Sequence, residues 1–288
     1  MPLVTNLIDD KSPLILYDST WTPGNSAGDA YEDQYYLGTF TTNSVTNGAV
    51  SLSFNGTGVW IYGAKRSNYN TYTVQLDSAT YGPYDGYYPT QEFLQVLFNQ
   101  TGLTQGMHNL TLTNTGTNGT YVDIDLVGIL FLSSPFSDVE NEMGIQIVWQ
   151  SEVGSSNQEL ITETVQNTDP RFQFLDSAWT SPSNVNFYSN GTGQCTGTNA
   201  ANAVLTFTVR WSRCSAQPRL PPGPTSFRWT RGNPSDYNGT TFLPYYGVTL
   251  FHADNLDAGQ HSLTITNAPA SPGQQLCIDY ALVSDLSE

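Results

Sequence analysis

The stretch "GMHNLTLTN", residues 106–114, decides the fold because it returns almost unchanged as "GQHSLTITN" at 259–267. The segments that precede the two stretches also match in the same register, "VLFNQTGL" at 96–103 with "TLFHADNL" at 249–256. A segment order that recurs at long range predicts one structural unit present twice.

The repeat continues outward in both directions. Upstream, "DSTWTP" at 18–23 pairs with "DSAWTSP" at 176–182. Downstream, "DIDLV" at 123–127 pairs with "CIDYALV" at 277–283. The repeat therefore covers nearly all of each half of the chain.

Within one unit, apolar residues alternate with polar ones, as in "AVSLSF" at 49–54 and "HNLTLT" at 108–113. A period of two with frequent Thr, Val and Tyr, interrupted by Gly, Asn and Pro, is typical of half-buried antiparallel strands. The sequence predicts an all-β protein with two tandem antiparallel β-sandwich domains.

The two copies set the expected domain boundaries. We expect a first domain at 1–136, an acidic linker at 137–160 and a second domain at 161–288, the linker carrying a short helix or an added edge strand. The longest apolar run, "LVGILFL" at 126–132, has the length of a strand, so no membrane span is expected.

The composition narrows the classes of partner. A net charge of −16 disfavours nucleic acid, because binding phosphates requires many Lys and Arg residues, and it disfavours anionic membranes. Neutral, hydroxyl-rich partners such as polysaccharides or glycans are compatible with this charge. Six Asn-x-Ser/Thr sequons favour a glycosylated protein that is secreted or exposed at the cell surface. They are Asn55, Asn99, Asn109, Asn118, Asn190 and Asn238.

The "D-S-x-W", "G-x-H-x-L-T-x-T-N" and "I-D-Y/L" strands of both halves resemble a known family, as does "FNGTGVWIYGA" at 54–64. This family is the galactose-binding-domain-like jelly rolls that occur in pairs in basidiomycete cell-surface proteins. The resemblance implies the jelly-roll fold and an extracellular setting.

The segment 209–232 breaks the repeat. It holds five of the nine basic residues of the chain, where the first copy has "GVWIYGAKRSNYNTYTVQLD" at 58–77. Three explanations compete: a basic insertion, a divergent loop, or translation in the wrong reading frame. Read one base earlier, the codons of Arg228 and Trp229 give an apolar residue and those of Trp229 and Thr230 give Asp, as in Leu76 and Asp77 of the first copy, which favours the frame error. On this basis we expect the second sandwich to lack core strands there.

The three cysteines are odd in number. An odd count in a secreted protein leaves one thiol unexplained. If Cys214 results from the shifted frame, Cys195 and Cys277 remain as a disulfide that ties an early loop to the last strand.

The expected ligand site lies in two tyrosine-rich loops of the first copy, 65–72 and 80–92. Sugars offer C–H faces that pack on aromatic rings and hydroxyls that need fixed polar partners, and Tyr supplies both. The alternative is that the exposed tyrosines merely cover loop surface. The candidate ligand-binding residues are Lys65, Arg66, Tyr69, Tyr84, Asp85, Tyr87 and Tyr88.

Residues that recur in both copies are expected to be structural. His108 and His261 are predicted to be hydrogen-bonding residues, and no catalytic triad or histidine metal cluster is discernible. The pairs Asp18 with Asp176 and Asp125 with Asp279 are predicted to cap turns and strand ends. A structural Ca²⁺ site at these carboxylates is the alternative, and no other cofactor is expected.

These features favour a carbohydrate-binding protein without catalytic activity. A glycoside hydrolase with two carboxylates is the first alternative, although no spacing selects the pair. A structural or adhesion ectodomain is the second, since this scaffold serves many functions.

Overall fold

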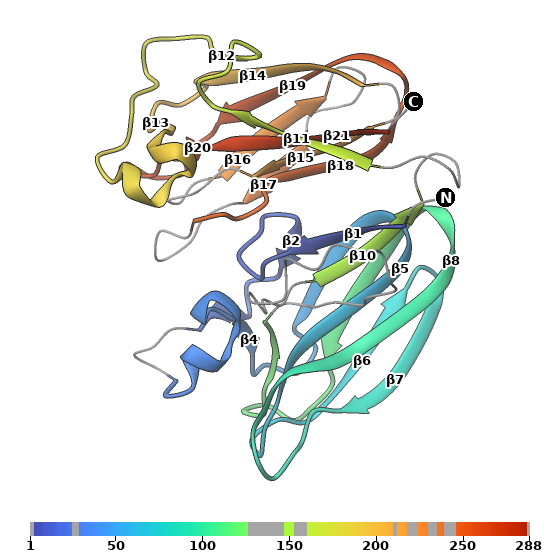
Figure 1. The fold of residues 1–288 in the computed structure, drawn as a ribbon. Helices are drawn as coiled ribbons and strands as arrows, with labels where there is room; N and C mark the ends of the chain where they lie inside the picture. Colours follow the sequence, from blue (N-terminus) through green and yellow to red (C-terminus); the bar gives the residue numbers. More distant parts are fainter. Residues whose placement is uncertain are drawn as a thin grey trace. The chain divides into compact units, whose positions relative to one another are not determined.

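The computed structural model describes residues 3–24, 29–125, 147–152, 160–209, 212–217, 224–229, 235–238 and 246–286. The chain divides into two compact units (Figure 1). The first consists of Leu3–Lys11 and Ile15–Glu152, and the main part of the second is Val153–Glu288. Each unit is built from antiparallel strands, so the all-β class is confirmed.

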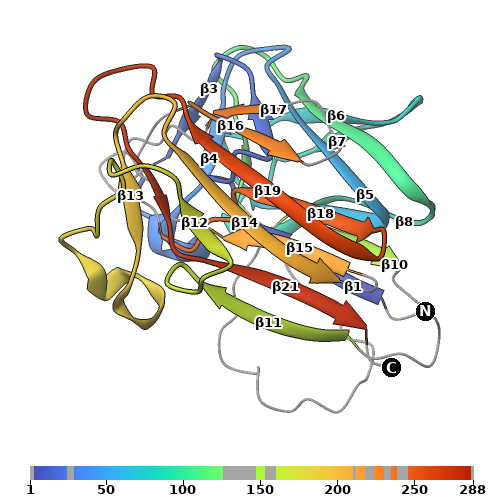
Figure 2. The same cartoon turned by 90° about the horizontal axis from the view of Figure 1, so that it is seen from above.

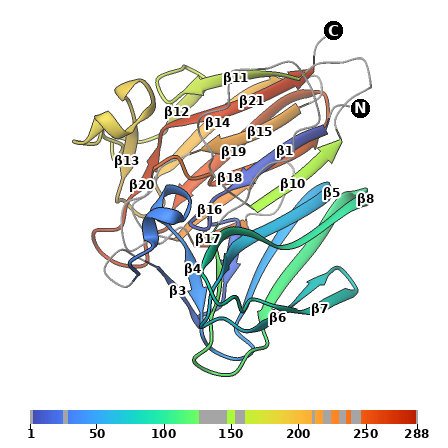
Figure 3. The same cartoon turned by 60° about the horizontal axis from the view of Figure 1, so that its bottom comes forward.

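The first unit contains ten strands and two 3₁₀ turns among its described residues. They are β1 (Leu3–Ile8), β2 (Ile15–Tyr17), β3 (Trp21–Pro23), η1 (Glu32–Gln34), η2 (Tyr36–Gly38), β4 (Thr41–Asn43), β5 (Ala49–Lys65), β6 (Thr71–Leu76), β7 (Ala79–Asp85), β8 (Glu92–Asn114), β9 (Val122–Ile124) and β10 (Ile147–Glu152). The main sheet has the order β1-β10-β5-β8-β6-β7, with β2 also paired to β5, and a small sheet has the order β3-β4-β9 (Figure 3).

The long strand β5 shows how the sequence builds this sheet. Val50, Leu52 and Phe54 are buried at every second position. The register with β8 shifts between Gly56 and Gly58, and after this bulge burial resumes one position out of phase at Val59 and Ile61. An extra residue in one strand changes which side chains face the core and bends the strand. The single strand β5 therefore contributes buried residues on both sides of the bulge.

The second unit contains eleven strands and two 3₁₀ turns among its described residues. They are β11 (Leu160–Gln166), β12 (Phe172–Phe174), η3 (Val185–Phe187), η4 (Ser189–Gly191), β13 (Gln194–Thr196), β14 (Asn202–Val209), β15 (Ser212–Gln217), β16 (Pro224–Trp229), β17 (Ser235–Asn238), β18 (Phe251–Leu256), β19 (Gly259–Asn267), β20 (Leu276–Ile278) and β21 (Tyr280–Leu286).

Two sheets of the second unit enclose its core (Figure 2). Their orders are β11-β21-β15-β18 and β12-β14-β19-β16-β17. Leu205 and Leu263 of one sheet and Val165 and Ala281 of the other belong to the same buried cluster and are fully buried. This arrangement is a β-sandwich, in which the inner faces of two sheets supply the core.

The same strand pairing recurs in the two units, as the sequence repeat predicts. Leu52 of β5 pairs with Leu110 of β8, and Leu205 of β14 pairs with Leu263 of β19. The short pairs β4 with β9 and β13 with β20 also correspond. Duplication of the sequence is thus a duplication of topology.

Part of the segment predicted as a linker, 137–160, is a strand of the first unit. Its strand β10 lies between β1 and β5, the place that β21 takes between β11 and β15 in the second unit. The longest apolar run, at 126–132, and the predicted boundary at residue 136 lie outside the described residues.

The expectation that 209–232 lacks core strands is wrong. This segment forms β15, which pairs with β18 and β21, and β16, which pairs with β17 and β19. In β16, Phe227 and Trp229 occupy the register positions that Val74 and Leu76 occupy in β6. These two residues restore the alternation that a strand needs, which the Arg and Pro residues around them obscure. The reading frame itself stays a prediction.

The predicted disulfide between Cys195 and Cys277 is confirmed, and it joins β13 to β20. Trp21 and Trp179, which repeat with their strands, are both buried. In the described part of the chain, no helix has the length and apolar character required to cross a membrane.

Candidate functional site

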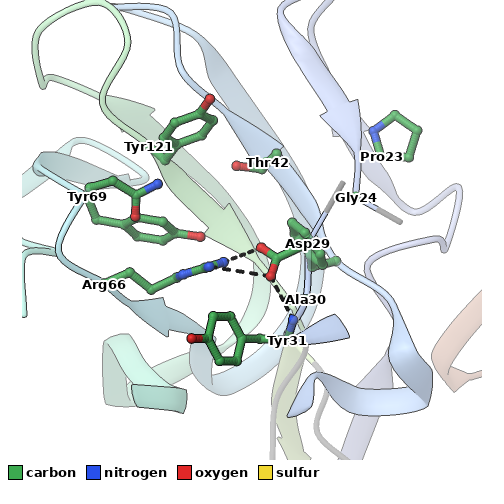
Figure 4. A pocket seen from close by; sticks show the side chains of 11 residues that line it. Pro23, Gly24, Asp29, Ala30, Tyr31, Thr42, Arg66, Tyr69 and Tyr121 are labelled. Atoms are coloured by element: carbon green, nitrogen blue, oxygen red, sulfur yellow. Dashed lines mark hydrogen bonds and ion pairs between the residues drawn. The ribbon is translucent and has the colours of Figure 1, made fainter. Parts of the chain in front are cut away.

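A cavity of about 340 Å³ lies beside the small β3-β4-β9 sheet of the first unit (Figure 4). Its walls come from segments that are distant in the sequence. The described lining residues are Pro23, Gly24, Asp29, Ala30, Tyr31, Phe40, Thr42, Arg66, Asn68, Tyr69 and Tyr121. Three tyrosine rings, an amide and an ion pair thus surround one space, whose volume is within the range of small-molecule sites.

The guanidinium of Arg66 is the centre of this cavity wall. It forms an ion pair with Asp29 and also donates a hydrogen bond to the Tyr35 hydroxyl over 3.3 Å. The same group lies 5.4 Å from the ring centroid of Tyr31 and 5.8 Å from that of Tyr69. Burial lowers the pKa of Arg66, but the hydrogen bond that Arg66 donates to Asp29 outweighs this effect and the pKa is raised. The planar guanidinium of Arg66 is therefore held in one orientation and stays protonated.

Asp29, the partner of Arg66 in the ion pair, is held by a further hydrogen bond. Its carboxylate also accepts a hydrogen bond of 2.9 Å from the backbone nitrogen of Tyr31 (Figure 4). Both side chains of the ion pair are largely buried, at 15% exposed for Arg66 and 13% for Asp29. Because the opposite charges are in contact, the cavity wall is polar and directional but close to neutral.

A buried carboxylate accepts hydrogen bonds from Tyr69 of the cavity wall and from Tyr35, which does not line the cavity. Asp123 is fully buried and accepts hydrogen bonds from the hydroxyls of Tyr69 and Tyr35, the latter over 2.7 Å, and from the Ala64 backbone nitrogen over 2.7 Å. Gly63 leaves room for it, since a Cβ there would lie 2.6 Å from the Asp123 carboxylate. Burial raises the pKa of Asp123, while these hydrogen bonds lower it. The network fixes the Tyr69 ring as a cavity wall.

A second network around a buried carboxylate holds β4 and the residues just before it, and this segment contributes Phe40 and Thr42 to the cavity wall. Asp10 forms an ion pair of 2.6 Å with Lys11 and accepts hydrogen bonds from Thr39 over 2.7 Å and Thr41 over 2.6 Å. Lys11 also donates to the carbonyl of Phe40 over 2.7 Å. A buried pair with this many hydrogen bonds is satisfied on both sides, and its role is to hold β4 and its approach in place.

Two further carboxylates in this region, those of Asp125 and Asp9, each accept a hydrogen bond through one oxygen only among the described residues. Asp125 accepts a hydrogen bond from the Tyr36 backbone nitrogen over 3.1 Å, and Asp9 accepts one from the Lys11 backbone nitrogen over 2.7 Å. The second oxygen of each is buried and has no hydrogen-bond partner among the described residues. Burial and the neighbouring Asp10 and Asp123 raise the pKa of Asp125 to about 10, so its carboxyl group is neutral at pH 7.

The structure separates the predicted ligand-binding residues into two groups. Arg66 and Tyr69 line the cavity, and Lys65 lies half-exposed at the end of β5. Tyr84 packs on Tyr72, with ring centroids 5.6 Å apart.

The remaining predicted residues lie on the loop after β7. Asp85 accepts a hydrogen bond from the Tyr87 backbone nitrogen over 2.8 Å, and Tyr87 and Tyr88 are 51% and 42% exposed. Backbone pairing of Tyr87 and Tyr88 with Arg66 attaches this loop to the cavity residue.

Asp29, Tyr31 and Tyr121 were not among the predicted residues. Each lies far from 65–72 in the sequence and is brought to Arg66 by the fold. The tyrosine-rich stretch "AYEDQYY" at 30–36 carries the same composition signal as the predicted loops and could have indicated Tyr31.

Several predicted structural roles are confirmed. Asp18 accepts hydrogen bonds from the Thr20 and Ala49 backbone nitrogens over 2.8 and 2.6 Å, and Asp176 accepts one from Ala178 over 2.9 Å. These are turn caps.

The paired strand-end carboxylates and the paired histidines behave in the same way. Asp279 accepts a hydrogen bond from the Ser189 backbone nitrogen over 3.0 Å, as Asp125 does from Tyr36. His108 bonds to Asp77 over 2.7 Å, and His261 bonds to the Asp257 carbonyl over 2.6 Å. No group of three or more His, Cys, Asp or Glu side chains in the described ranges has the arrangement of a metal site. The calcium interpretation stays a prediction.

No protein-family model and no curated protein matches the chain. Among solved structures, the chain is similar to a Paenibacillus xanthan lyase, with a TM-score of 0.33 and 15% identity over 100% of this chain and 27% of that one. The chain thus spans about a quarter of that protein. It is also similar to the CBM36-1 domain of a multidomain xylanase from the hindgut metagenome of Trinervitermes trinervoides, with a TM-score of 0.31 and 12% identity over 43% of this chain and 96% of that one.

Proposed function

We propose that the protein is an extracellular glycan-binding protein and that its first unit holds an uncharged sugar unit in the cavity beside Arg66. The observation that carries the proposal is the combination of three tyrosine rings with a rigid ion pair around one space. Tyr31, Tyr69 and Tyr121 offer aromatic surface to the C–H faces of a sugar. The Arg66–Asp29 pair and the Asn68 amide offer fixed partners to its hydroxyls.

The electrostatics favour a neutral sugar. The charge of Arg66 is already compensated by Asp29, so it is not available to a ligand carboxylate or sulfate. The chain as a whole carries a net charge of −16, which repels polyanionic polysaccharides. A neutral wall or surface glycan is therefore the expected ligand.

The geometry favours binding over hydrolysis. A glycosidase needs two carboxyl groups that flank the scissile bond. Asp29 is the one carboxylate among the described residues that line the cavity, and it is engaged with Arg66. Asp123 does not line the cavity, and its carboxylate accepts hydrogen bonds from Tyr35 and Tyr69.

An extracellular location is supported by the Cys195–Cys277 disulfide, since disulfides persist in oxidising compartments. The exposed sequon residues Asn99, Asn109 and Asn118 are accessible to glycosylation in such a compartment.

The test is an array of neutral oligosaccharides (glucan, mannan, galactan and xylan hexamers) probed with the full chain. Tyr31→Ala removes one ring, and we expect it to reduce binding to at least one glycan about tenfold, since stacked aromatic anchors commonly contribute more than 1 kcal/mol. Tyr31→Phe keeps the ring and is expected to retain most of the binding.

Tyr88→Ala is the matched control, since Tyr88 is exposed but does not line the cavity. An array without binding to any neutral glycan, or equal binding by wild type and Tyr31→Ala, would contradict the proposal. Loss of binding in Tyr88→Ala but not in Tyr31→Ala would move the site to the loop after β7, as the sequence alone suggests.

A further inference from the structure

The second unit contains a pocket at the position that corresponds to the cavity of the first. In the small sheets, Cys195 pairs with Cys277 at the centre of β13 and β20, as Thr42 pairs with Asp123 at the centre of β4 and β9. A pocket of about 360 Å³ adjoins the disulfide, as the first cavity adjoins Thr42. Duplication has therefore reproduced the hollow as well as the strands.

The aromatic residues around the two hollows also correspond. Tyr35 precedes η2 and Tyr188 precedes η4, both with extended backbone. Tyr35 meets Phe93 edge to face, with centroids 4.9 Å apart and planes at 78°, and Tyr188 meets Tyr246 at 5.8 Å and 76°. The tyrosine beside the small sheet and its edge-on partner are thus retained.

The chemistry of the second pocket is different. Where the first unit has the buried Asp123 carboxylate, the second has the disulfide, and the Tyr188 hydroxyl lies 3.4 Å from Cys195 Sγ. The described residues that line the second pocket include no charged side chain. Its polar lining consists of hydroxyls and amides such as those of Ser183, Asn184 and Gln275.

An aromatic platform stands beside this pocket. Phe187 and Tyr246 are stacked, with centroids 4.8 Å apart and planes at 13°, and Tyr246 lines the pocket. Asn184 donates a hydrogen bond to the Tyr246 hydroxyl, which orients that ring. Phe187 is 56% exposed, although contact of a large aromatic side chain with water is unfavourable. An exposed ring next to a pocket with hydroxyl and amide groups is the arrangement that binds the face of a sugar.

We infer that the second unit carries its own glycan site, formed by Phe187, Tyr246 and Asn184, that binds a neutral sugar without using a charged side chain. The ligand class rests on the proposed function, but the site is separate from the Arg66 cavity. The chain then has two sites with different polar partners, and each is expected to select its own neutral glycans.

Unit-specific variants on the same array of neutral oligosaccharides test this inference. Tyr31→Ala addresses the first site, and Phe187→Ala and Tyr246→Ala address the second. Phe187→Ala removes a largely exposed ring, so it is expected to keep the fold, which thermal unfolding checks. Leu175→Ala is the matched control, because Leu175 is 58% exposed in the same unit and does not line the pocket.

We expect Phe187→Ala and Tyr246→Ala to weaken at least fivefold the binding of glycans that Tyr31→Ala still binds, and Leu175→Ala to leave it unchanged. If Tyr31→Ala abolishes all binding, or if neither second-unit variant changes any signal, the second site is refuted. If Tyr31→Ala has no effect while Phe187→Ala loses binding, the second site stands and the function proposed for the first cavity fails. An array without any signal refutes both.

Discussion

At the scale of single residues, the first unit concentrates buried carboxylates around its candidate site. Asp10 and Asp123 have partners that satisfy them, whereas Asp125 has one buried oxygen without a partner among the described residues. Such a group is costly to ionise, and its neighbours Asp10 and Asp123 add repulsion. Burial and these neighbouring carboxylates therefore favour the protonated form of Asp125.

Asp125→Asn tests this assignment through pH dependence. The folded-state pKa of Asp125 is raised to about 10, whereas an unfolded chain has a value of about 3.9. Between these two values the folded state holds a proton that the unfolded state has lost, so the free energy of unfolding falls as pH rises. We expect Asp125→Asn to remove this slope, which is at most about 1.4 kcal/mol per pH unit, and to be more stable than wild type at pH 8.

Urea unfolding of both proteins at pH 4, 6 and 8 measures the effect. Asp33→Asn serves as the control, because Asp33 is exposed in η1. Parallel pH profiles of wild type and Asp125→Asn would show that Asp125 is ionised in the folded protein.

At the scale of elements, the small sheets of the two units differ at the central residue pair. In the first, Asp123 of β9 accepts hydrogen bonds from two tyrosine hydroxyls outside the strand pair, whereas in the second a disulfide joins β13 to β20. The disulfide links short strands that three residue pairs alone would hold weakly.

Replacing both Cys195 and Cys277 by Ser is expected to destabilise the second unit. The bridge spans 82 residues, and loop-closure entropy for that length gives about 4.5 kcal/mol as an upper estimate. Calorimetry with and without dithiothreitol measures the loss. The double Ser variant should show no further change on reduction, and an unchanged melting temperature in the variant would contradict the expectation.

The strand β16 gives a second prediction at this scale. Its residues from Thr225 to Trp229 pair with β19. Because β16 lies between β17 and β19, the amide hydrogens that it donates in the ladder should exchange at least about a hundredfold more slowly than those of an unfolded chain. Hydrogen exchange followed by mass spectrometry of peptides from 224–229 provides the measurement. Exchange at the unfolded rate would show that the strand does not form and would restore the frame error as the leading explanation.

At the scale of the whole molecule, each unit has its own apolar core. Val50, Leu112 and Val74 belong to the first, and Leu205 and Leu263 to the second. Units with separate cores can unfold separately.

We therefore expect two thermal transitions in calorimetry of the full chain. Dithiothreitol should lower the midpoint of one transition and leave the other in place, because the disulfide lies in the second unit alone. A single transition that shifts as a whole on reduction would show that the units unfold cooperatively.

The sequence by itself determined the strands of the repeated motifs, their duplication and the disulfide. Alternation in "AVSLSF" and "HNLTLT" is local, since it reports which side of each strand faces the core, and the repeat transfers this information from one unit to the other. The turn caps at Asp18 and Asp176 are local as well, and they were predictable for the same reason.

The tertiary structure decided the cavity, the place of β10 and the strand β16. Arg66 and Asp29 are 37 residues apart, and Tyr121 comes from a third segment. No local sequence pattern predicts that these three residues line one cavity, because this depends on how the loops fold over the ends of the paired strands. The predicted loop residues Tyr87 and Tyr88 share the composition of the cavity lining but not its position, which only the fold could distinguish.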